Sequence, residues 1–215
     1  DPVAKKVTDW RVPTAWTRPY DAEYDDKQYA WAAGMDADAD GLLSPAEVQF
    51  ESAAYDAATG KSLWKNAVPA TYSDDFGFDE GPRATPVVDD GRVFALGADG
   101  RMLAVRAADG SRLWELDLKK TLGAEKGFFG FASSPLVRNN TVIVNAGGTT
   151  GAGIIGLDAE TGKILWKTTA HEAGYSSPVP APGSKPGIVC SFTREGVVIL
   201  DPTTGRSLGE FPWRA

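Results

Sequence analysis

Residues 36–47, DADADGLLSPAE, place oxygen donors at the spacing of an EF-hand-type calcium loop. Aspartates fill loop positions 1, 3 and 5, and Gly41 fills position 6, where the chain must turn sharply. Position 7 offers a backbone carbonyl, position 9 a serine hydroxyl and position 12 a glutamate with two oxygens. The stretch predicts a Ca²⁺ site with six ligands: Asp36, Asp38, Asp40, Leu42, Ser44 and Glu47.

The end of this loop has a second interpretation. Ser44, Pro45 and Glu47 form the pattern of a capped helix start, which explains residues 44–47 but not three alternating aspartates followed by glycine. The flanks predict a short entering helix over 24–35 and a short exit helix over 47–53. No second loop is present to pair with the first, so we expect weak binding, about 10⁻⁵ to 10⁻³ M, by an ion that orders the insertion.

The elements that must hold this loop belong to a repeat. Four stretches share an apolar residue, Asp, two small residues, Thr-Gly and a terminal Trp, with a spacing of about 40 to 50 residues that suits one four-stranded unit per repeat. These are AYDAATGKSLW (54–64), AVRAADGSRLW (104–114), GLDAETGKILW (156–166) and ILDPTTGRSLG (199–209).

Each stretch predicts a β-hairpin. The Asp side chain accepts backbone N–H bonds in the turn, the Gly allows positive φ, and the Trp is expected to pack on the neighbouring unit. A second hairpin precedes three of them, over 83–100, 133–148 and 175–196, so each repeat has four strands. The pattern predicts an all-β fold, a β-propeller of about four blades, whereas a sandwich of similar strands lacks the fixed period.

The A-x-D-x-x-T-G-x-x-x-W hairpin resembles the quinoprotein-type, PQQ-like propeller family over roughly residues 53 to 211. Arg106 and Asp109 depart from the pattern in the second copy, and Gly209 replaces Trp in the fourth. The stretches GPRATPVVDDGRVFALGADGRM and AGYSSPV are similar to extracytoplasmic members of planctomycete type. The resemblance implies rings of seven or eight blades, so a partial chain is favoured over a four-bladed ring or closure with another copy.

The expected organisation has three parts: an irregular segment or strand over 1–24, a short helical EF-hand-like insertion over 25–52 and propeller repeats over 53–215. The net charge of −7 argues against nucleic acid as a partner, and no apolar run approaches a membrane span. The single cysteine, Cys190, lies in an apolar run and predicts a buried, inert thiol. A periplasmic or otherwise extracytoplasmic location fits the resemblance and a structural calcium ion.

Catalytic patterns are missing from the sequence. The single histidine, His171, rules out a His-based metal triad, and beside Glu172 it is either a lone acid–base group or a polar loop residue. The resemblance also implies alcohol and sugar dehydrogenases with pyrroloquinoline quinone, but the adjacent Cys-Cys pair of the alcohol dehydrogenases is absent. No catalytic or cofactor-binding residue is therefore assigned.

Two aromatic and charged loops, 73–83 and 125–134, are candidates for ligand or partner contacts, with Phe128, Phe129 and Phe131 as the best partner-facing residues. Packing across the central channel is the alternative role for both loops. The sequence favours a non-catalytic scaffold that binds Ca²⁺ and a protein or ligand, or self-associates, through its loops or propeller edge. The alternative is part of a quinoprotein oxidoreductase whose cofactor residues lie outside this chain.

Overall fold

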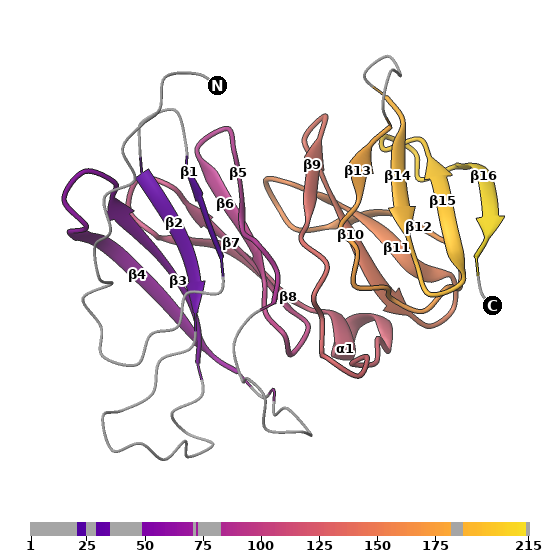
Figure 1. Cartoon of the computed structure of the whole chain (residues 1–215), viewed down its shortest axis with the longest axis horizontal. Coiled ribbons are helices and arrows are strands. Elements are labelled where there is room, and N and C mark those ends of the chain that lie inside the picture. The colour runs from indigo at the N-terminus through magenta and orange to yellow at the C-terminus, as the bar shows by residue number, and fades with distance from the viewer. Residues whose placement is uncertain are drawn as a thin grey trace.

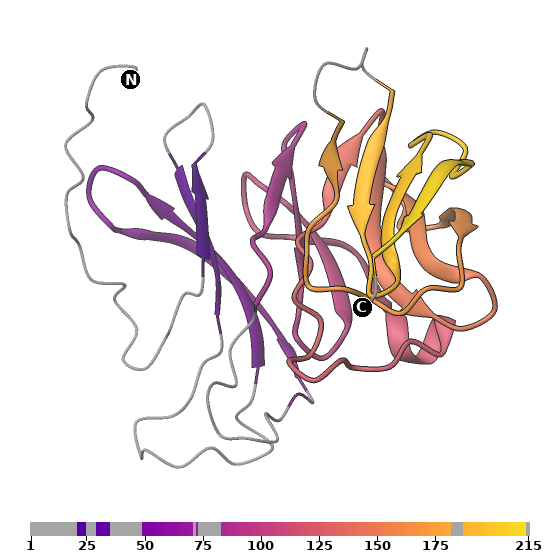
Figure 2. The ribbon, with the colours of Figure 1, turned by 45° about the vertical axis from the view of Figure 1, so that its right-hand side comes forward.

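The computed structural model describes residues 21–24, 29–34, 49–70, 72, 83–181 and 187–213. These residues form four antiparallel sheets of four strands each, which follow one another in chain order (Figures 1 and 2). We call them blades 1 to 4. This arrangement confirms the predicted propeller of about four four-stranded blades.

The strands within each blade pair with their neighbours along the chain. Blade 1 contains β1 (Asp21–Tyr24), β2 (Tyr29–Gly34), β3 (Gln49–Asp56) and β4 (Ser62–Pro69). Blade 2 contains β5 (Val87–Asp89), β6 (Arg92–Leu96), β7 (Arg101–Arg106) and β8 (Arg112–Asp117). Blade 3 contains β9 (Leu136–Arg138), β10 (Thr141–Gly148), β11 (Ala152–Asp158) and β12 (Ile164–Thr168). Blade 4 contains β13 (Val179–Pro180), β14 (Val189–Phe192), β15 (Gly196–Leu200) and β16 (Ser207–Pro212).

Blade 1 corrects the expected helices around the acidic loop. Residues 29–34 form strand β2, which pairs with β3 from Tyr29↔Asp56 to Gly34↔Glu51, so the entering helix over 24–35 is wrong. Strand β3 begins at Gln49, within the expected exit helix. The aromatic and alanine residues of 29–34 alternate, which suits a pleated strand as well as a helical turn.

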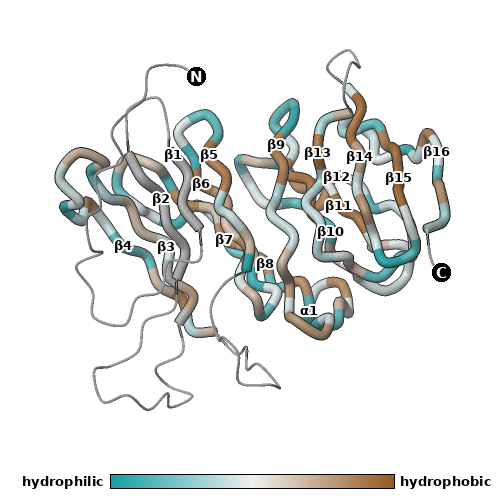
Figure 3. The backbone as a smooth tube through the Cα atoms, in the orientation of Figure 1, coloured by the Kyte–Doolittle hydropathy of each residue, from teal (hydrophilic) through white to brown (hydrophobic). Residues whose placement is uncertain are grey.

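The hydrophobic core lies between neighbouring blades, where the facing sides of adjacent sheets bury their side chains. Val93, Ala95, Leu103 and Val105 of blade 2 pack on blade 1, whereas the alternate residues of the same strands pack on blade 3. Branched aliphatic residues in near-continuous runs suit strands that are covered on both faces. Figure 3 shows the resulting pattern, with hydrophobic strands and hydrophilic turns.

In blades 1 to 3, a tryptophan near the start of the outer strand links the blade to the next one. The indole Nε1 of Trp64, Trp114 and Trp166 donates to a backbone carbonyl in the following blade's Asp-x-x-Thr-Gly turn, at 2.9 to 3.0 Å. The three acceptors are Ala107, Ala159 and Pro202, each the second residue of its turn. This contact confirms the predicted packing of each tryptophan on its neighbour.

The glycine of each turn makes room for the indole. A Cβ at Gly110 would lie 2.4 Å from the Trp64 ring, and one at Gly162 would lie 2.6 Å from the Trp114 ring. Both glycines have φ of +70°, the left-handed region that favours glycine. Each of these turns therefore requires its glycine for two reasons: the backbone has positive φ, and the neighbouring ring leaves no room for a Cβ.

The aspartates cap these turns as predicted. The Oδ1 atom of Asp158 accepts from Thr161 N at 2.8 Å and from Thr161 Oγ1 at 2.7 Å. The hydrogen bond with the Thr161 side chain, reinforced by backbone donors, lowers the pKa of Asp158 although burial raises it. Asp56 and Asp201 likewise have lowered pKa values, caused first by the Thr59 side chain and by the Thr203 backbone, respectively.

The departure in blade 2 preserves the same turn. Arg106 replaces the aspartate, and its Nη1 lies 3.3 Å from Oδ2 of Asp109 and 2.8 Å from Oγ of Ser111. The Asp109 carboxylate accepts from Ser111 N at 2.9 Å, so the charge has moved three residues along the turn. The backbone bond from Gly110 N to Arg106 O, at 2.9 Å, matches the other blades.

The antiparallel order gives the molecule two ends. The Asp-x-x-Thr-Gly turns lie at one end. The inter-blade linkers and the turns between the second and third strands lie at the other, which we call the linker end. Helix α1 (Leu118–Leu122) stands there between β8 and β9 (Figure 1), capped by Asp117 and ended by Gly123 with φ of +61°. Within the described ranges, no helix is long and apolar enough to cross a bilayer.

Candidate functional site

Exposed aromatic rings gather at the linker end. Phe128 and Phe129 are 51% and 37% exposed and meet edge to face with ring centroids 4.6 Å apart. Tyr175, from the linker between blades 3 and 4, lies 5.6 Å from the Phe129 ring, and its hydroxyl accepts from Phe129 N at 3.2 Å. Residues from two separate linkers therefore fix one exposed aromatic cluster.

Two cations border this cluster. The Arg83 guanidinium lies 5.6 Å from the Phe129 ring centroid and 5.8 Å from the Tyr72 ring. Lys126 Nζ lies 5.5 Å from the Tyr72 ring. Cations at this distance from aromatic faces are attracted by the ring quadrupole. The group of six, which we call the aromatic–cation cluster, comprises Tyr72, Arg83, Lys126, Phe128, Phe129 and Tyr175.

The third predicted partner-facing residue belongs to the core. Phe131 is 3% exposed, and its ring fills the space where a Cβ at Gly100 would lie 2.6 Å away. The backbone N–H of Phe131 donates to Ala98 O at 3.0 Å, which ties the linker to the β6–β7 turn. The partner-facing prediction is therefore wrong for Phe131, because Gly100 provides a cavity for its ring, whereas Phe128 and Phe129 are exposed as predicted.

A pocket of about 410 Å³ opens beside the cluster. Four segments line it: the linker after α1, the end of β10, the linker before β13 and the β14–β15 turn. The charged or titratable side chains of the lining are Glu125, Lys126, His171, Glu172 and Arg194. The sequence did not indicate this pocket, because no motif connects its segments.

His171 contacts two residues of blade 4. Its Nδ1 lies 3.0 Å from Thr193 Oγ1, and that hydroxyl donates its own proton to Gly196 O at 3.0 Å. Its Nε2 lies 3.7 Å from Glu210 Oε2 of β16. These contacts join the linker before β13 to blade 4.

The other charged side chains of the pocket are two acids and two bases, and one acid and one base form an ion pair. Arg194 Nε lies 3.2 Å from Glu172 Oε2, and the Arg194 backbone N–H donates to Glu172 O at 3.3 Å. These contacts join the β14–β15 turn to the linker before β13. A glycine-lined pocket with both signs of charge suits a small polar ligand or the side chain of a partner.

Hydroxyl side chains connect successive linkers where the first strands of the blades begin. Thr85 N donates to Ser134 Oγ at 2.7 Å, and Ser134 N donates to Ser177 Oγ at 3.0 Å. The three residues occupy the same place in the recurring tripeptides 84–86, 133–135 and 176–178. This recurrence was a signal for the chain of hydrogen bonds that the sequence analysis missed.

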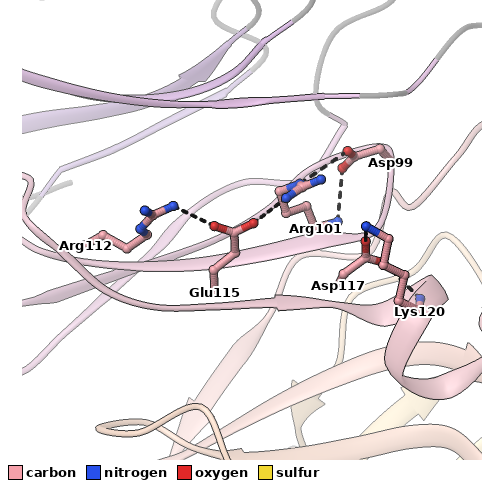
Figure 4. Close-up of polar contacts among 6 residues, drawn as sticks. All are labelled: Asp99, Arg101, Arg112, Glu115, Asp117 and Lys120. Atoms are coloured by element: carbon pink, nitrogen blue, oxygen red, sulfur yellow. Dashed lines mark hydrogen bonds and ion pairs between the residues drawn. The ribbon is translucent and has the colours of Figure 1, made fainter.

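An ion network supports the linker end of blade 2 (Figure 4). Arg101 pairs with Glu115, and Arg112 Nη1 lies 2.7 Å from the second oxygen of Glu115. Arg101 Nε also lies 3.7 Å from Oδ2 of the buried Asp99. Burial lowers the pKa of Arg101, but the hydrogen bond with Glu115 and the charges of Asp99 and Glu115 outweigh it, so the pKa is raised.

Asp117 anchors helix α1 within the same region. Its Oδ1 accepts from Lys120 N at 3.0 Å, and Lys120 Nζ lies 3.5 Å from Oδ2. Burial raises the pKa of Asp117, but the hydrogen bonds and charge of Lys120 outweigh it, so the pKa is lowered. At the other end of the helix, Leu122 O accepts from Thr149 N at 3.0 Å and from Thr149 Oγ1 at 3.1 Å. The helix thereby positions the wall of the pocket.

The predicted calcium ligands at 36, 38, 40, 42, 44 and 47 lie outside the described residues. The described residues on either side of this stretch, Gly34 at the end of β2 and Gln49 at the start of β3, lie at the linker end of blade 1. In the part of the chain that the structure describes, no three His, Cys, Asp or Glu side chains could hold a metal ion. Cys190 is partly buried, where full burial was expected, and is a free thiol.

Comparison with known proteins supports the fold. The chain matches the PQQ_2 family, described as outer membrane protein assembly factor BamB, over residues 8–127 and 53–213. It is 31% identical over 121 residues to the dehydrogenase subunit of a quinone alcohol dehydrogenase from Komagataeibacter europaeus, covering 53% of this chain and 16% of the relative. The chain thus spans about a sixth of that relative's length.

Two solved structures share the architecture. BamB from Moraxella catarrhalis superposes with a TM-score of 0.53 at 18% identity, covering 92% of this chain and 52% of that one. A europium-containing methanol dehydrogenase gives a TM-score of 0.55 at 15% identity, covering 90% of this chain and 41% of that one. With its four-stranded blades and tryptophan-linked turns, the chain belongs to the PQQ-like β-propeller family described as outer membrane protein assembly factor BamB.

Proposed function

We propose that this chain is an extracytoplasmic, non-catalytic β-propeller scaffold that binds a protein partner through the linker end and is stabilised there by Ca²⁺. The observation that carries the proposal is the aromatic–cation cluster. Phe128, Phe129 and Tyr175 are exposed yet held by ring contacts and by the bond from Phe129 N to the Tyr175 hydroxyl.

Such a cluster has the composition of an interaction hot spot. Aromatic residues and arginine dominate the binding energy of protein interfaces, and rings that are already ordered lose little conformational entropy on binding. Arg83 and Lys126 bring positive charge to this patch of a chain with net charge −7. The cluster therefore favours a partner segment with an aromatic or aliphatic anchor flanked by acidic residues.

A selection from phage-displayed random peptides tests this surface. We expect the selected peptides to lose at least about tenfold in affinity with Phe129→Ser, in line with the loss of a hot-spot side chain. Leu165→Ser is the matched control, because Leu165 is a similarly exposed apolar residue, 53%, on the outer strand of blade 3. Peptides that bind both variants as tightly as the wild type would contradict the proposal.

The calcium part of the proposal rests on the spacing of the oxygen donors in the acidic loop. Loop positions 1 and 12 bind one ion at about 2.4 Å each, so their oxygens come within about 5 Å of one another. The register pairs Gly34 with Glu51, two residues into β3 from Gln49, so the loop joins two adjacent antiparallel strands. An ion bound by Asp36 and Glu47 would hold the two ends of that loop together.

Terbium luminescence excited through tryptophan tests this site, because Trp31 precedes the first ligand by five residues. We expect saturable emission that Ca²⁺ displaces and that Glu47→Gln weakens at least about tenfold, since position 12 supplies two oxygens. Asp90→Asn removes an exposed acid from the β5–β6 turn and should leave the emission unchanged. The absence of a saturable signal would contradict the calcium site and leave residues 44–47 as a capped helix start.

The proposed location is supported by family membership and by the proposed ion. The family description names an outer membrane protein assembly factor, BamB, and the Moraxella catarrhalis structure carries the same protein name. Loops with affinities of about 10⁻⁴ to 10⁻³ M are typical of extracellular calcium modules. Protease accessibility of the protein in intact and permeabilised spheroplasts of its host would test the location, and cleavage only after permeabilisation would contradict it.

A quinone-dependent oxidoreductase is the second candidate, favoured by the 31% identity to a quinone alcohol dehydrogenase subunit. Quenching of tryptophan fluorescence by added pyrroloquinoline quinone, with and without Ca²⁺, separates the two candidates. Under the scaffold proposal we expect no saturable quenching. Saturable quenching at micromolar quinone would favour the oxidoreductase and overturn the non-catalytic assignment.

A further inference from the structure

The pocket at the linker end is bounded by the two linkers that precede and follow blade 3. On one side, Thr149 of the β10–β11 turn donates its N–H to Leu122 O at 3.0 Å. On the other side, a Cβ at Gly147 would lie 2.5 Å from Ala173 N. Both linkers therefore contact the end of β10, and this contact fixes the shape of the pocket between them.

The walls of the pocket consist mainly of residues with little or no side chain. The volume of about 410 Å³ lies within the range of small-ligand sites. Phe128, which is 51% exposed, adds an aromatic surface to the lining. Such a lining leaves room for a long unbranched chain and offers a ring for it to pack against. The small residues are Gly123, Gly127, Gly147, Gly148, Ala170 and Ala173.

The charged side chains of the lining differ in their partners. Arg194 Nε lies 3.2 Å from Glu172 Oε2, so these two charges balance each other. Lys126 Nζ lies 5.5 Å from the Tyr72 ring. Glu125 is exposed and makes no hydrogen bond or ion pair with any residue that the structure describes. A ligand that displaces water from this carboxylate must replace its hydration, which a cation does best.

We propose that this pocket binds the basic side chain of a protein partner, a lysine or an arginine, with its cation at Glu125 and its stem against Phe128. Both side chains combine an apolar methylene stem with a terminal positive charge. The stem suits walls of glycine and alanine beside a phenyl ring, and the charge suits the carboxylate.

This inference rests on the proposed function, because it names a residue that the partner of the aromatic–cation cluster would carry. Phe128 and Lys126 belong both to that cluster and to the lining of the pocket. A partner segment whose anchor packs on the cluster would therefore reach the pocket with a neighbouring side chain. The partner would carry its acidic residues toward Arg83 and its basic residue toward Glu125.

Acidic and uncharged side chains fit the pocket less well. An acidic side chain would compete with Glu172 for Arg194 and would be repelled by Glu125. An uncharged side chain would remove water from Glu125 without supplying a counter-charge. Both classes therefore serve as control ligands.

A nuclear magnetic resonance titration with single amino-acid derivatives tests the pocket without the rest of a partner. The basic probes are Nα-acetyl-lysine amide and Nα-acetyl-arginine amide. We expect them to shift the amide resonances of Gly147 and Gly148 with a dissociation constant of about 1 mM, which is usual for ligands of this size. Gly162, in the Asp-x-x-Thr-Gly turn of blade 3 at the other end of the molecule, should not respond.

Two control probes differ from lysine in charge. Nα-acetyl-norleucine amide keeps the unbranched stem without the ammonium group, and Nα-acetyl-glutamate α-amide reverses the charge. Both should bind at least about tenfold more weakly than the lysine probe, because a hydrogen bond to a charged group is lost.

Two variants test the carboxylate and the space separately. Glu125→Gln keeps the shape and removes the charge, so it should weaken the basic probes at least about tenfold. Glu160→Gln, an exposed acid in the Asp-x-x-Thr-Gly turn of blade 3, is the matched control and should have no effect. Ala170→Trp should block the pocket without a change of charge, because residue 170 is exposed and lines it.

The outcomes distinguish this inference from the proposed function. Phe129→Ser should weaken the peptides selected on the cluster but leave the basic probes unaffected, because Phe129 does not line the pocket. Peptides that depend on Phe129, together with a failure of both basic probes to bind, would overturn this inference alone. Basic probes that depend on Glu125, with no peptide bound at the cluster, would contradict the proposed function and leave the cation preference of the pocket.

The control probes and variants supply the remaining outcomes. Binding of norleucine or glutamate amide as tight as that of the lysine probe would overturn the inference, because the charge of the ligand would then not be recognised. An unchanged affinity in Glu125→Gln would overturn it as well, because the cation would then lie elsewhere.

Discussion

The indole of Trp166 and the glycine at position 205 form a single contact between blades 3 and 4. A Cβ at Gly205 would lie 2.4 Å from the ring, and the indole Nε1 donates to Pro202 O at 3.0 Å. The ring also lies over Gly156 of its own blade, where a Cβ would be 2.2 Å away. Two glycines on different blades therefore define the slot for one side chain.

Removal of that side chain should separate blade 4 from blade 3. Trp166 is 8% exposed, so we expect Trp166→Ala to lower the free energy of unfolding by about 3–5 kcal/mol, the usual cost of truncating a buried aromatic residue. Leu165→Ala changes the exposed neighbour and should cost less than about 0.5 kcal/mol. Urea titration followed by circular dichroism measures the free energy of unfolding of both variants. Equal losses for Trp166→Ala and Leu165→Ala would show that the buried indole does not stabilise the contact between blades 3 and 4.

The two requirements on the turn glycines can be measured separately. Gly91 and Gly162 have φ of +71° and +70°, but only Gly162 lies against a ring. A Cβ at Gly162 would lie 2.6 Å from the Trp114 ring, whereas a Cβ at Gly91 would have no atom within 4 Å. Gly91→Ala should cost about 1–2 kcal/mol for the left-handed backbone alone. Gly162→Ala should cost about 1–3 kcal/mol more, because the Trp114 ring must move. Thermal melts of the two variants measure this difference in stability. Equal losses for Gly91→Ala and Gly162→Ala would show that the Trp114 ring moves aside without cost.

Acid should weaken the capped turns. Because the pKa of Asp158 is lowered in the folded chain, its contribution to stability is present above the unfolded value of about 3.9 and is lost as the pH falls through the lower folded value. Asp158→Asn should therefore melt below the wild type at pH 6, and the two should converge toward pH 2. The effect is at most about 1 kcal/mol, because the carboxylate is exposed to solvent.

A second variant of the same turn checks the cause. Thr161→Val removes the hydroxyl donor to Asp158 but keeps the backbone donor, so its melting temperature should show a pH dependence between those of the wild type and Asp158→Asn. A difference between wild type and Asp158→Asn that does not change with pH would show that the turn is stabilised by something other than the ionised carboxylate.

The hydroxyl chain of the linkers should be sensitive to the loss of a single hydroxyl. Ser134→Ala leaves Thr85 N–H without its acceptor, at a cost of about 1–3 kcal/mol if no water replaces the hydroxyl. Hydrogen exchange at Thr85 should accelerate with it. The exposed Thr203→Ala is the control and should change neither the melting temperature nor that exchange rate. Unchanged protection at Thr85 would mean that the bond contributes nothing.

Residues 53–211 were predictable because local rules and tertiary packing agree there. Asp, Thr and Gly at set spacing define the turns, and strand alternation between them defines the blades. Arg106 and Asp109 departed from the pattern without altering the turn, because Arg106 bridges the displaced carboxylate. The prediction for residues 29–34 failed because the calcium motif beside them implied a helix, whereas pairing with β3 made them a strand.

The linker end was less predictable because its contacts join distant segments. Phe128, Phe129 and Phe131 stand in one short run, and only the space beside Gly100 decides which ring is buried. The pocket likewise needs residues of four segments between 123 and 194. Neither spacing nor periodicity within a segment contains that information.

The direction of the tryptophan contact has a consequence for how such chains change in evolution. Blades 2 and 3 each present an indole to the next blade and a turn glycine to the indole of the preceding blade. A duplicate of either blade, inserted between two blades, would therefore bring both halves of each new contact. A blade could thus be added by tandem duplication without a compensating substitution in the neighbouring blades. Gly209 marks the position where this compatibility stops, because a unit copied from blade 4 would offer its successor no indole.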